Sequence, residues 1–502
     1  MGRTPESKMV KSAQVALILF GVFCILPLCV KAESREFRGV WIATHQNIDW
    51  PAHRGMSSLK QQRSLTYLFD VARDLRLNAV LFQVRPDGDT LYPSDYEPWS
   101  AVLSGKQGEP PLPIWDPVDT AVQLAHERGL EFHAWFNPYR VGTNITSAEL
   151  DPKSFGKTHP ESLRTYGKYL WLDPGDPIVV VHTLNVITEL IEKYDVDGIH
   201  LDDYFYPYPI NDAKGVEIDF PDQPTWKKYG IKTGLSKSDW RRKNVSDFIQ
   251  ALYERVRSIP KQNHVKVGIS PFGLYRPGSP DGEGDLDQFK SLYADPLLWM
   301  QKGWLDYLAP QIYWKYGIKK TNYSDILAWW LQPTVVNLKG RHVWPGISTS
   351  SLNDRTGWTN TDIIDEIDEA RKQKAGGTIQ FSMGAFLGDE KINHALIEGP
   401  FQELALAPET PWLATDEVGA PVIVSRTKSG MNLKAEWKQA NSSDQVRFYA
   451  LSWVHPDKTK KLFRISSKAT VSAEIPAEAQ FLEVLPLGKT EKAGPSLVVS
   501  LK

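Results

Sequence analysis

Two adjacent aspartates, Asp202 and Asp203, follow an apolar run that is typical of a buried β-strand. The chain reads DGIHLDDY over residues 197–204, so the two carboxyl groups come where the run ends. Cleavage of a glycosidic bond uses two carboxyl groups, one that protonates the leaving oxygen and one that acts as nucleophile or base. The pair is therefore the candidate for catalysis, with Asp202 as the main group. Asp203 is equally suited to cap the next loop or to hold a neighbouring side chain.

The alternation of side chains along a strand predicts which residues face a ligand. Ile199 and Leu201 form the apolar set of their run, so His200 and Asp202 point to the opposite side. The same test on other apolar runs places further polar residues on that side, near the end of each run: Gln83, Arg85, Asn137, Gln311, Tyr313, Gln380 and Ser382. A barrel built for stability alone would carry Val, Ile and Leu at such positions, so the pattern predicts a binding site.

Aromatic and planar polar side chains gather after the ends of the same runs. Sugars bind proteins through such groups, because ring faces stack on aromatic side chains while hydroxyls pair with polar groups. The predicted substrate-binding residues are Gln83, Arg85, Asp87, Asn137, Tyr139, Arg140, His200, Tyr204, Gln311, Tyr313 and Trp314. Among them, Arg85 is expected to orient Asp202 or to bind a substrate oxygen. A polysaccharide is the expected substrate.

Eight apolar, β-favouring runs alternate with amphipathic stretches whose apolar residues recur at i, i+3 and i+4. Strands are predicted at 39–44, 79–84, 130–137, 197–202, 265–270, 307–313, 343–348 and 377–382. Alternating strands and helices predict an α/β fold with a parallel sheet, and eight units predict a (β/α)8 TIM barrel over residues 36–405. The reactive groups of such a barrel lie at the carboxyl ends of its strands. An open doubly wound sheet is the alternative, but no glycine-rich phosphate loop follows the first run.

The last part of the chain changes character after a proline-rich boundary. Residues 415–502 hold seven short apolar runs at regular spacing without a helical pattern, which predicts a C-terminal β-sandwich of the fibronectin type III kind. No residue in it suggests catalysis. We expect this module to fold apart from the barrel, because the boundary is proline-rich and the strands complete their own core.

The first 32 residues are predicted to be a signal peptide. Lys8 and Lys11 precede a long apolar stretch, and Val30–Ala32 supplies a small-residue cleavage site. The protein is therefore expected in the periplasm or with the cell envelope, without a permanent membrane span; a retained anchor, or a lipid on Cys29, is the alternative. The two cysteines, Cys24 and Cys29, lie within this segment, so the mature chain has no thiolate for catalysis or for zinc binding.

The charge balance argues against nucleic acid as a partner. The chain has 58 Lys and Arg against 60 Asp and Glu, which gives no basic excess for a phosphate backbone. No two histidines have the spacing of a strand-end zinc site, which disfavours a zinc-dependent polysaccharide deacetylase. No metal or other cofactor is expected. The 18 tryptophans suit either a large core or a groove that stacks flat sugar rings.

Six ordered blocks resemble one known family over roughly residues 36 to 400. They read EFRGVWIAT, LNAVLFQVRPDGDTLYPSDYEPWS, HAWFNPYR, DGIHLDDYFYP, GISPFG and LDYLAPQIYW. Together they are similar to the glycosyl-hydrolase-like family ten proteins, exported bacterial barrels that include a division-site glycosidase of peptidoglycan glycans without peptides. The resemblance implies an exported glycoside hydrolase of a cell-wall polysaccharide, with peptidoglycan glycan strands as its substrate.

The block DGIHLD is also similar to the fourth strand of the α-amylase superfamily, where an aspartate at the position of Asp202 is the nucleophile. His200 stands where those enzymes have arginine, and the segment GISPFGLYRPG after the fifth run has no carboxylate. The partner of Asp202 is therefore open among Asp87, Asp203 and Glu283, and an N-acetyl group of the substrate is a further candidate for the nucleophile. A non-catalytic glycan-binding barrel is the alternative function.

Overall fold

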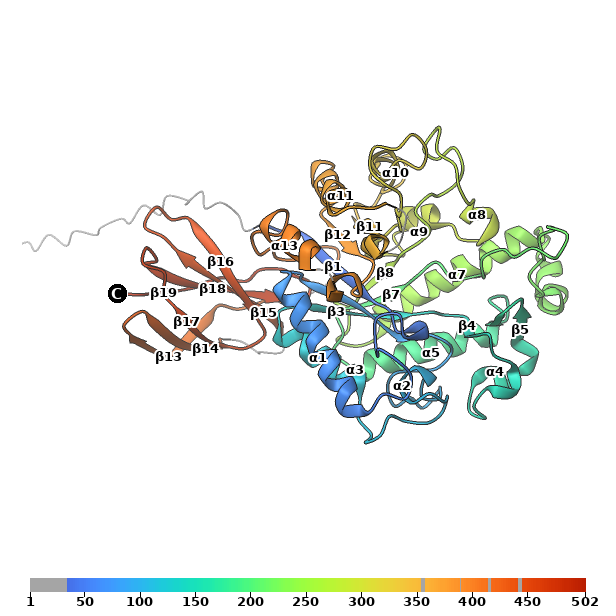
Figure 1. Cartoon of the computed structure of the whole chain (residues 1–502), viewed down its shortest axis with the longest axis horizontal. Coiled ribbons are helices and arrows are strands. Elements are labelled where there is room, and N and C mark those ends of the chain that lie inside the picture. Colours follow the sequence, from blue (N-terminus) through green and yellow to red (C-terminus); the bar gives the residue numbers. More distant parts are fainter. Residues whose placement is uncertain (1–33, 354–356, 389, 414–416, 441–444) are drawn as a thin grey trace, which may run out of the picture.

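The computed structural model describes residues 34–353, 357–388, 390–413, 417–440 and 445–502 (Figure 1). The predicted signal peptide, with Cys24 and Cys29, lies outside these residues. Within the described ranges, no helix combines the length and the apolar character needed to cross a membrane. A parallel α/β part comes first in the chain, and antiparallel sheets follow at one end of it (Figure 1).

A nine-stranded parallel sheet forms the centre of the larger part. Its strands are β1 (Phe37–Ile42), β2 (Ala79–Arg85), β3 (Glu131–Phe136), β7 (Gly198–Leu201), β8 (Lys266–Ile269), β9 (Tyr307–Leu308), β10 (His342–Val343), β11 (Gly346–Ile347) and β12 (Gly377–Gln380). Their order is β10-β9-β8-β7-β3-β2-β1-β12-β11. β10 and β11 are two halves of the seventh predicted strand, separated only by Trp344 and Pro345, and they pair with β9 and β12, respectively. The two ends of the sheet are thus one stretch of chain, and the sheet curls round on itself as in a TIM-like barrel.

Helices follow most strands and cover the outside of the sheet (Figure 1). The longer helices are α1 (Ser58–Asp74), α3 (Pro117–Glu127), α5 (Pro177–Lys193), α7 (Lys237–Ser258), α9 (Pro296–Lys302), α10 (Tyr323–Trp330), α11 (Asn360–Lys372) and α13 (Glu390–Glu398). The shorter ones are α2 (Ala101–Ser104), α4 (Phe155–Thr158), α6 (Gln223–Thr225), α8 (Gln288–Ser291) and α12 (Ala385–Gly388). Asp116 and Asp176 begin α3 and α5, because each accepts a hydrogen bond from backbone N–H at the helix start and is followed by proline.

An aromatic cluster fills the inside of the barrel. Phe37, Trp41, Trp135, Tyr307 and Trp344 belong to it, and the rings of Phe37 and Trp344 stack with their centroids 3.7 Å apart. Such side chains close the interior, so the barrel is a packed core rather than a pore.

β12 shows that the interior is more apolar than the alternation test assumed. Ile379 belongs to the inner cluster and Phe381 packs against it. Because neighbours along a strand point to opposite faces, Gln380 points outward, and Ser382 binds the carboxylate of Asp49. The prediction that Gln380 and Ser382 face the interior was therefore wrong, because the apolar set of this strand points inward.

A small antiparallel sheet follows β3. It consists of β4 (Arg140–Thr143), β6 (Tyr169–Leu172) and β5 (Leu163–Tyr166), with β6 in the middle. β4 begins with Arg140, only three residues after Asn137, so this insertion fixes Arg140 close to the carboxyl end of β3.

The C-terminal part is built from two antiparallel sheets. One contains β13 (Pro421–Ser429), β14 (Asn432–Gln439) and β17 (Thr470–Glu474), and the other contains β16 (Lys460–Ser466), β15 (Val446–Val454), β18 (Phe481–Gly488) and β19 (Leu497–Ser500). Buried residues from both sheets, among them Leu433, Trp437, Leu451 and Leu482, form one hydrophobic core. This arrangement is compatible with a β-sandwich, while the fibronectin type III topology stays a prediction.

The C-terminal sheets also share buried contacts with the barrel. Arg447 of β15 is buried and forms ion pairs with Asp195 at 2.7 Å and with Asp197 at 2.8 Å, just before β7. Leu406 packs in one apolar cluster with Phe448 and other residues of the second sheet. The expectation that the C-terminal module folds apart from the barrel stays a prediction, although Arg447 of that module is neutralised by carboxylates of the barrel.

Candidate active site

A cavity of about 260 Å³ lies at the carboxyl ends of the parallel strands. Seven predicted site residues line it: Gln83, Arg140, Asp202, Asp203, Tyr204, Gln311 and Tyr313. The rest of the wall consists of Trp41, Ala43, His45, Ile48, Trp135, Ser270 and Phe381. Aromatic, amide and charged groups thus converge on one space, as in sites that bind a polar ring.

Asp202 lies one residue beyond β7 and is held by three hydrogen-bond donors. Its Oδ2 accepts hydrogen bonds from Asn137 Nδ2 at 2.5 Å and from Trp135 Nε1 at 3.2 Å, and its Oδ1 accepts one from the backbone N–H of Tyr204 at 3.1 Å. Burial raises the pKa of Asp202 above its usual range, while the Arg140 guanidinium and these three donors limit the rise. The surroundings therefore orient the carboxyl group and partly offset the cost of ionising it in a buried site.

Asp203 is also a buried carboxyl group, with a hydrogen-bond partner of its own. Its Oδ2 accepts a hydrogen bond from the hydroxyl of Tyr208, on the loop that follows β7. Burial and the neighbouring Asp202 carboxylate raise the pKa of Asp203 to about 7. A carboxyl group that keeps its proton up to neutral pH suits a general acid. The two adjacent carboxyl groups are thus suited to different roles.

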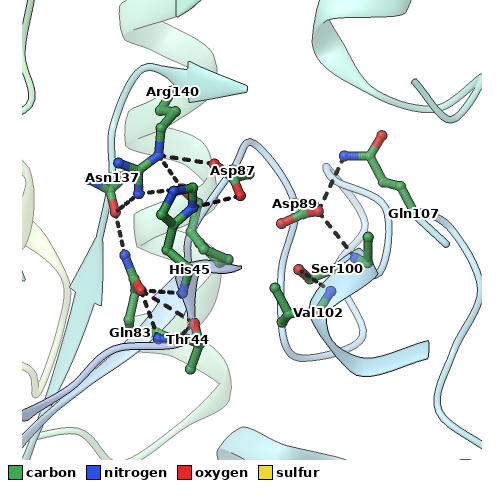
Figure 2. A network of polar contacts seen from close by, with 12 residues as sticks. Thr44, His45, Gln83, Asp87, Asp89, Ser100, Val102, Gln107, Asn137 and Arg140 are labelled. Atoms are coloured by element: carbon green, nitrogen blue, oxygen red, sulfur yellow. Dashed lines mark hydrogen bonds and ion pairs between the residues drawn. The ribbon is translucent and has the colours of Figure 1, made fainter. Parts of the chain in front are cut away.

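Amide hydrogen bonds connect Asn137, which binds Asp202, to the end of β1; Figure 2 shows the part of this network from Asn137 to Thr44 and His45. Oε1 of Gln83 accepts from the backbone N–H groups of Thr44 at 2.8 Å and His45 at 2.7 Å, while its Nε2 lies 2.5 Å from Oδ1 of Asn137. The Asn137 amide then uses its Nδ2 for Asp202. Each amide has one end that accepts and one that donates, so the network fixes both side-chain orientations.

His45 lines the cavity, although it was not predicted as a site residue. It begins a 3-10 turn, His45–Asn47, three residues beyond β1. Its Nδ1 lies 2.9 Å from Oδ2 of Asp87, and Oδ1 of Asp87 accepts a hydrogen bond from Arg140 Nε at 2.9 Å (Figure 2). Burial would raise the pKa of Asp87, but His45 and Arg140 outweigh it and lower the pKa to about 2, so the carboxylate is ionised. The position of His45 after the first strand is the signal that would have found it.

Arg85 does not reach the cavity, contrary to the prediction. A register shift between Gln83 and Arg85 in the pairing of β2 with β3 interrupts the alternation of side chains. The guanidinium is fully buried and binds Glu97 twice, with Nε 2.7 Å from Oε2 and Nη2 2.5 Å from Oε1. His182 of α5 binds the same carboxylate at 2.9 Å. Arg85 therefore anchors the loop after β2 instead of orienting Asp202.

Tyr139 and Trp314 were predicted to bind substrate, but the structure places both away from the cavity wall. Tyr139 is fully buried and packs against Phe248 of α7, with ring centroids 5.4 Å apart. Trp314 packs edge to face on Phe272, also with centroids 5.4 Å apart. Both rings therefore pack within the protein beside the site and do not face its cavity.

His200 lies beneath the cavity floor rather than in its wall. It is fully buried, with Nδ1 3.0 Å from the hydroxyl of Tyr307 and Nε2 3.0 Å from both Trp41 Nε1 and the hydroxyl of Ser270. Burial holds the pKa of His200 well below its usual range, so the ring is neutral. The alternation test thus predicted the inward direction of the His200 side chain correctly. Tyr307, Trp41 and Ser270 nevertheless occupy both ring nitrogens, and His200 does not line the cavity.

The other candidate carboxylates are engaged elsewhere. Asp87 is bound by His45 and Arg140, and Glu283 accepts a hydrogen bond from the backbone N–H of Asn322 at 3.1 Å without lining the cavity. Among the described residues, the carboxylates in the wall are therefore Asp202 and Asp203. The described part of the chain also brings together no group of three or more His, Cys, Asp or Glu that would hold a metal ion.

Comparison with known proteins identifies the family. A family model described as Glycosyl hydrolase-like 10 matches residues 36–367, which include β1, most of the parallel sheet and the residues of the cavity wall except Phe381. The chain belongs to the glycosyl hydrolase-like 10 family. The family that the six sequence blocks predicted is thus confirmed.

Curated relatives in this family are similar over most of their length. Glycosyl hydrolase YngK of Bacillus subtilis (strain 168) is 33% identical over 470 residues, which cover 90% of this chain and 89% of YngK. Glycosyl hydrolase DigH of Escherichia coli (strain K12) is 36% identical over 335 residues, which cover 62% of this chain and 74% of DigH. Among solved structures, the glycoside hydrolase domain of PgaB (BpsB) from Bordetella bronchiseptica aligns with 74% of this chain and 100% of that domain, at 15% identity and a TM-score of 0.49.

The family and its relatives also settle the class of enzyme. This chain is a glycoside hydrolase, as its sequence predicted, and its substrate class is a carbohydrate. The alternatives of a binding-only barrel and of a deacetylase lose their support.

Proposed function

We propose that this glycoside hydrolase cleaves a polysaccharide of 2-acetamido sugars, with the glycan strands of peptidoglycan as its substrate. One observation carries the proposal: Asp202 and Asp203 are neighbours in the chain and are the carboxylates that the described residues contribute to the cavity wall. The resemblance noted from the sequence and the predicted signal peptide support the cell wall as the location of the substrate.

Neighbouring carboxyl groups suit the chemistry of 2-acetamido sugars better than a mechanism with a protein nucleophile. The Cα atoms of adjacent residues lie about 3.8 Å apart, so both side chains rise from one edge of the cavity. A protein nucleophile or base and an acid must flank the scissile bond, with their carboxyl groups separated by about 5 to 9 Å. A nucleophile supplied by the substrate removes the need for a carboxylate on the far side of the sugar.

In the proposed first step, the carboxyl proton of Asp203 passes to the glycosidic oxygen as the bond from that oxygen to C1 breaks. The carbonyl oxygen of the sugar's own acetamido group forms the new bond to C1, which gives an oxazolinium ion. Water then attacks C1 and gives a proton to the Asp203 carboxylate, the bond from C1 to the acetamido oxygen breaks, and the acetamido group is restored. The pKa of about 7 supports Asp203 as the acid, because the group is protonated before the reaction and regains its proton afterwards.

Asp202 is proposed to stabilise the positive charge that develops on the acetamido nitrogen. A carboxylate held by Asn137, Trp135 and the backbone of Tyr204 costs little reorganisation when the charge appears. Trp135, Tyr204, Tyr313 and Phe381 supply aromatic faces for the sugar ring.

The decisive experiment incubates the mature protein with purified peptidoglycan, with and without prior removal of the peptides, and identifies the products by mass spectrometry. We expect soluble sugar fragments and no loss of acetyl groups. Aryl glycosides with an increasing number of fluorine atoms in the acetyl group separate the mechanisms, since fluorine weakens the carbonyl nucleophile. Rates that fall steeply with fluorination support the acetamido group as nucleophile, whereas unchanged rates would require a nucleophile from the protein.

A further inference from the structure

We propose that His45 is a further substrate-binding residue, whose Nε2 accepts a hydrogen bond from a hydroxyl group of the sugar. The inference rests on the proposed function in one respect, because it takes a sugar to be the occupant of the cavity. Its role is to position the ring, with no transfer of a proton.

The backbone and the ring of His45 are both fixed. The backbone N–H donates to Gln83 Oε1 at 2.7 Å, and the ring Nδ1 lies 2.9 Å from Oδ2 of Asp87. The side chain is 15% exposed and lines the cavity. Its Nε2 has no hydrogen-bond partner among the residues that the structure describes. One nitrogen is therefore committed to the protein, and the other is left for a ligand.

Asp87 decides which ring nitrogen carries the proton. An ionised carboxylate only accepts hydrogen bonds, so the nitrogen that faces it, Nδ1, must be the donor. In a neutral imidazole the other nitrogen is then an acceptor. Arg140 binds the second oxygen of Asp87 at 2.9 Å and so holds the carboxylate in place (Figure 2). The surroundings thus prepare Nε2 to receive a hydroxyl hydrogen.

The topology places this acceptor away from the carboxyl pair. β2 and β3 lie between β1, which His45 follows, and β7, which Asp202 follows. A sugar bound between them would be held at a hydroxyl by His45 while its acetamido and glycosidic groups face Asp202 and Asp203. The Gln83–Asn137 amides connect the two sides, so hydrogen bonds fix the position of His45 relative to Asp202.

The test uses two variants: one removes the acceptor nitrogen Nε2 of His45, and the other turns Nε2 into a donor. His45→Phe keeps an aromatic ring without nitrogen. Asp87→Asn can present its N–H to Nδ1 while its oxygen still faces Arg140, which makes Nδ1 the acceptor and Nε2 the donor. The control is Asp89→Asn in the same loop, because burial and Asp87 already raise the pKa of Asp89 to about 7. Asp89 does not line the cavity, and its Oδ2 pairs with Gln107 at 3.2 Å (Figure 2).

The readouts are binding of N-acetylglucosamine oligomers by calorimetry and the tautomer of His45 by ¹⁵N NMR of histidine-labelled protein. We expect wild type to show Nδ1–H, and both His45→Phe and Asp87→Asn to weaken binding about three- to ten-fold. The double variant should be no weaker than either single one, because both remove the same hydrogen bond. Asp89→Asn should bind as wild type does.

The outcomes separate this inference from the proposed function. If wild type binds the oligomers and His45→Phe binds equally well, the inference is overturned and the proposed function stands. If wild type fails to bind any 2-acetamido oligomer, both are overturned. An Nε2–H tautomer in wild type also overturns the inference, whatever the binding data show.

Discussion

Nδ2 of Asn137 lies 2.5 Å from Oδ2 of Asp202, and this amide is itself oriented by Gln83. The carboxylate at the end of β7 is therefore held from β3, and through Gln83 from β2, before any substrate arrives. Preorganised donors of this kind stabilise a charge without the cost of turning dipoles during the reaction. The catalytic role proposed for Asp202 depends on this arrangement.

Asp202→Asn should therefore abolish most of the activity while leaving the fold intact. The amide keeps the shape of the side chain but removes the charge that stabilises the developing cation. We expect a loss on the order of 100- to 10,000-fold in kcat. Activity on purified peptidoglycan and the Tm, measured together, test this expectation. Near-wild-type activity with an unchanged Tm would remove Asp202 from the mechanism.

The pH dependence of activity should show whether Asp203 is the general acid. The proposed acid must be protonated, and its pKa is raised to about 7, so kcat/KM should fall as the pH rises through that value. Asp203→Asn should lose activity on aryl glycosides with poor leaving groups far more than on those with good ones, because only the former need protonation. A profile in wild type that stays flat from pH 5 to pH 9 would contradict the assignment.

The raised pKa of Asp203 also affects the free energy of unfolding. A carboxyl group whose folded pKa is raised favours the folded state at low pH, and this contribution is lost as the pH rises through about 7. Asp203→Asn removes the buried charge that forms at high pH, so the variant should be more stable than wild type at pH 8, by on the order of 2 kcal/mol. At pH 4 the difference should be close to zero. Urea unfolding at both pH values measures it.

Much of this architecture was predictable from the sequence because local patterns determine it. Alternating apolar runs and amphipathic helices gave the parallel sheet, and Asp202 was placed correctly because Ile199 and Leu201 pack outward on helices. The prediction of inward-facing side chains failed in two strands, where the apolar residues do not mark the outer face or where the alternation is interrupted. In β12 the inner face is itself apolar, with Ile379 in the aromatic cluster. In β2 a register shift turns Arg85 away from the cavity.

The contacts that complete the site come from segments far apart in the chain. Glu97 neutralises Arg85, and Asp87 fixes His45 from a different strand end, yet no spacing in the sequence indicates either pair. The partner of a buried charge is a tertiary property. A sequence shows that an arginine follows a strand, but only the packed structure shows whether it meets substrate or a carboxylate.

Arg85 should accordingly matter for stability more than for catalysis. Its guanidinium and Glu97 are both fully buried, so loss of their two-point contact leaves the Glu97 carboxylate poorly paired inside the protein. We expect Arg85→Lys, which loses the two-point contact, to lower stability by roughly 2 to 4 kcal/mol while kcat of the folded fraction changes less than three-fold. Chemical unfolding and activity at low temperature distinguish these effects. A large fall in kcat at unchanged stability would return Arg85 to the site.

We expect the ion pairs of Arg447 to stabilise the contact between the C-terminal sheets and the barrel. Its side chain is buried and neutralises Asp197, which lies at the start of the strand that carries Asp202, and the half-exposed Asp195. Arg447→Met would leave the buried Asp197 carboxylate short of a partner, so we expect a loss of roughly 3 kcal/mol. Arg426→Met is the matched control, because that arginine is exposed and its side chain donates a hydrogen bond to the backbone oxygen of Lys502. Scanning calorimetry of both variants gives the comparison.

The pH dependence of this interface follows from the same charges. Burial opposes ionisation of Asp195 and Asp197, but Arg447 outweighs it and holds the pKa of each below its usual range. A lowered folded pKa stabilises the protein above the unfolded value, near 4, and this contribution is lost as the pH falls below it. The Tm difference between wild type and Arg447→Met should therefore be full at pH 6 to 8 and shrink below pH 4. A chain that ends at residue 413 should show a loss with the same pH dependence, because its acidic residues have lost Arg447. If that shortened chain melts like the full-length protein, the two parts are independent after all and the interface contributes nothing.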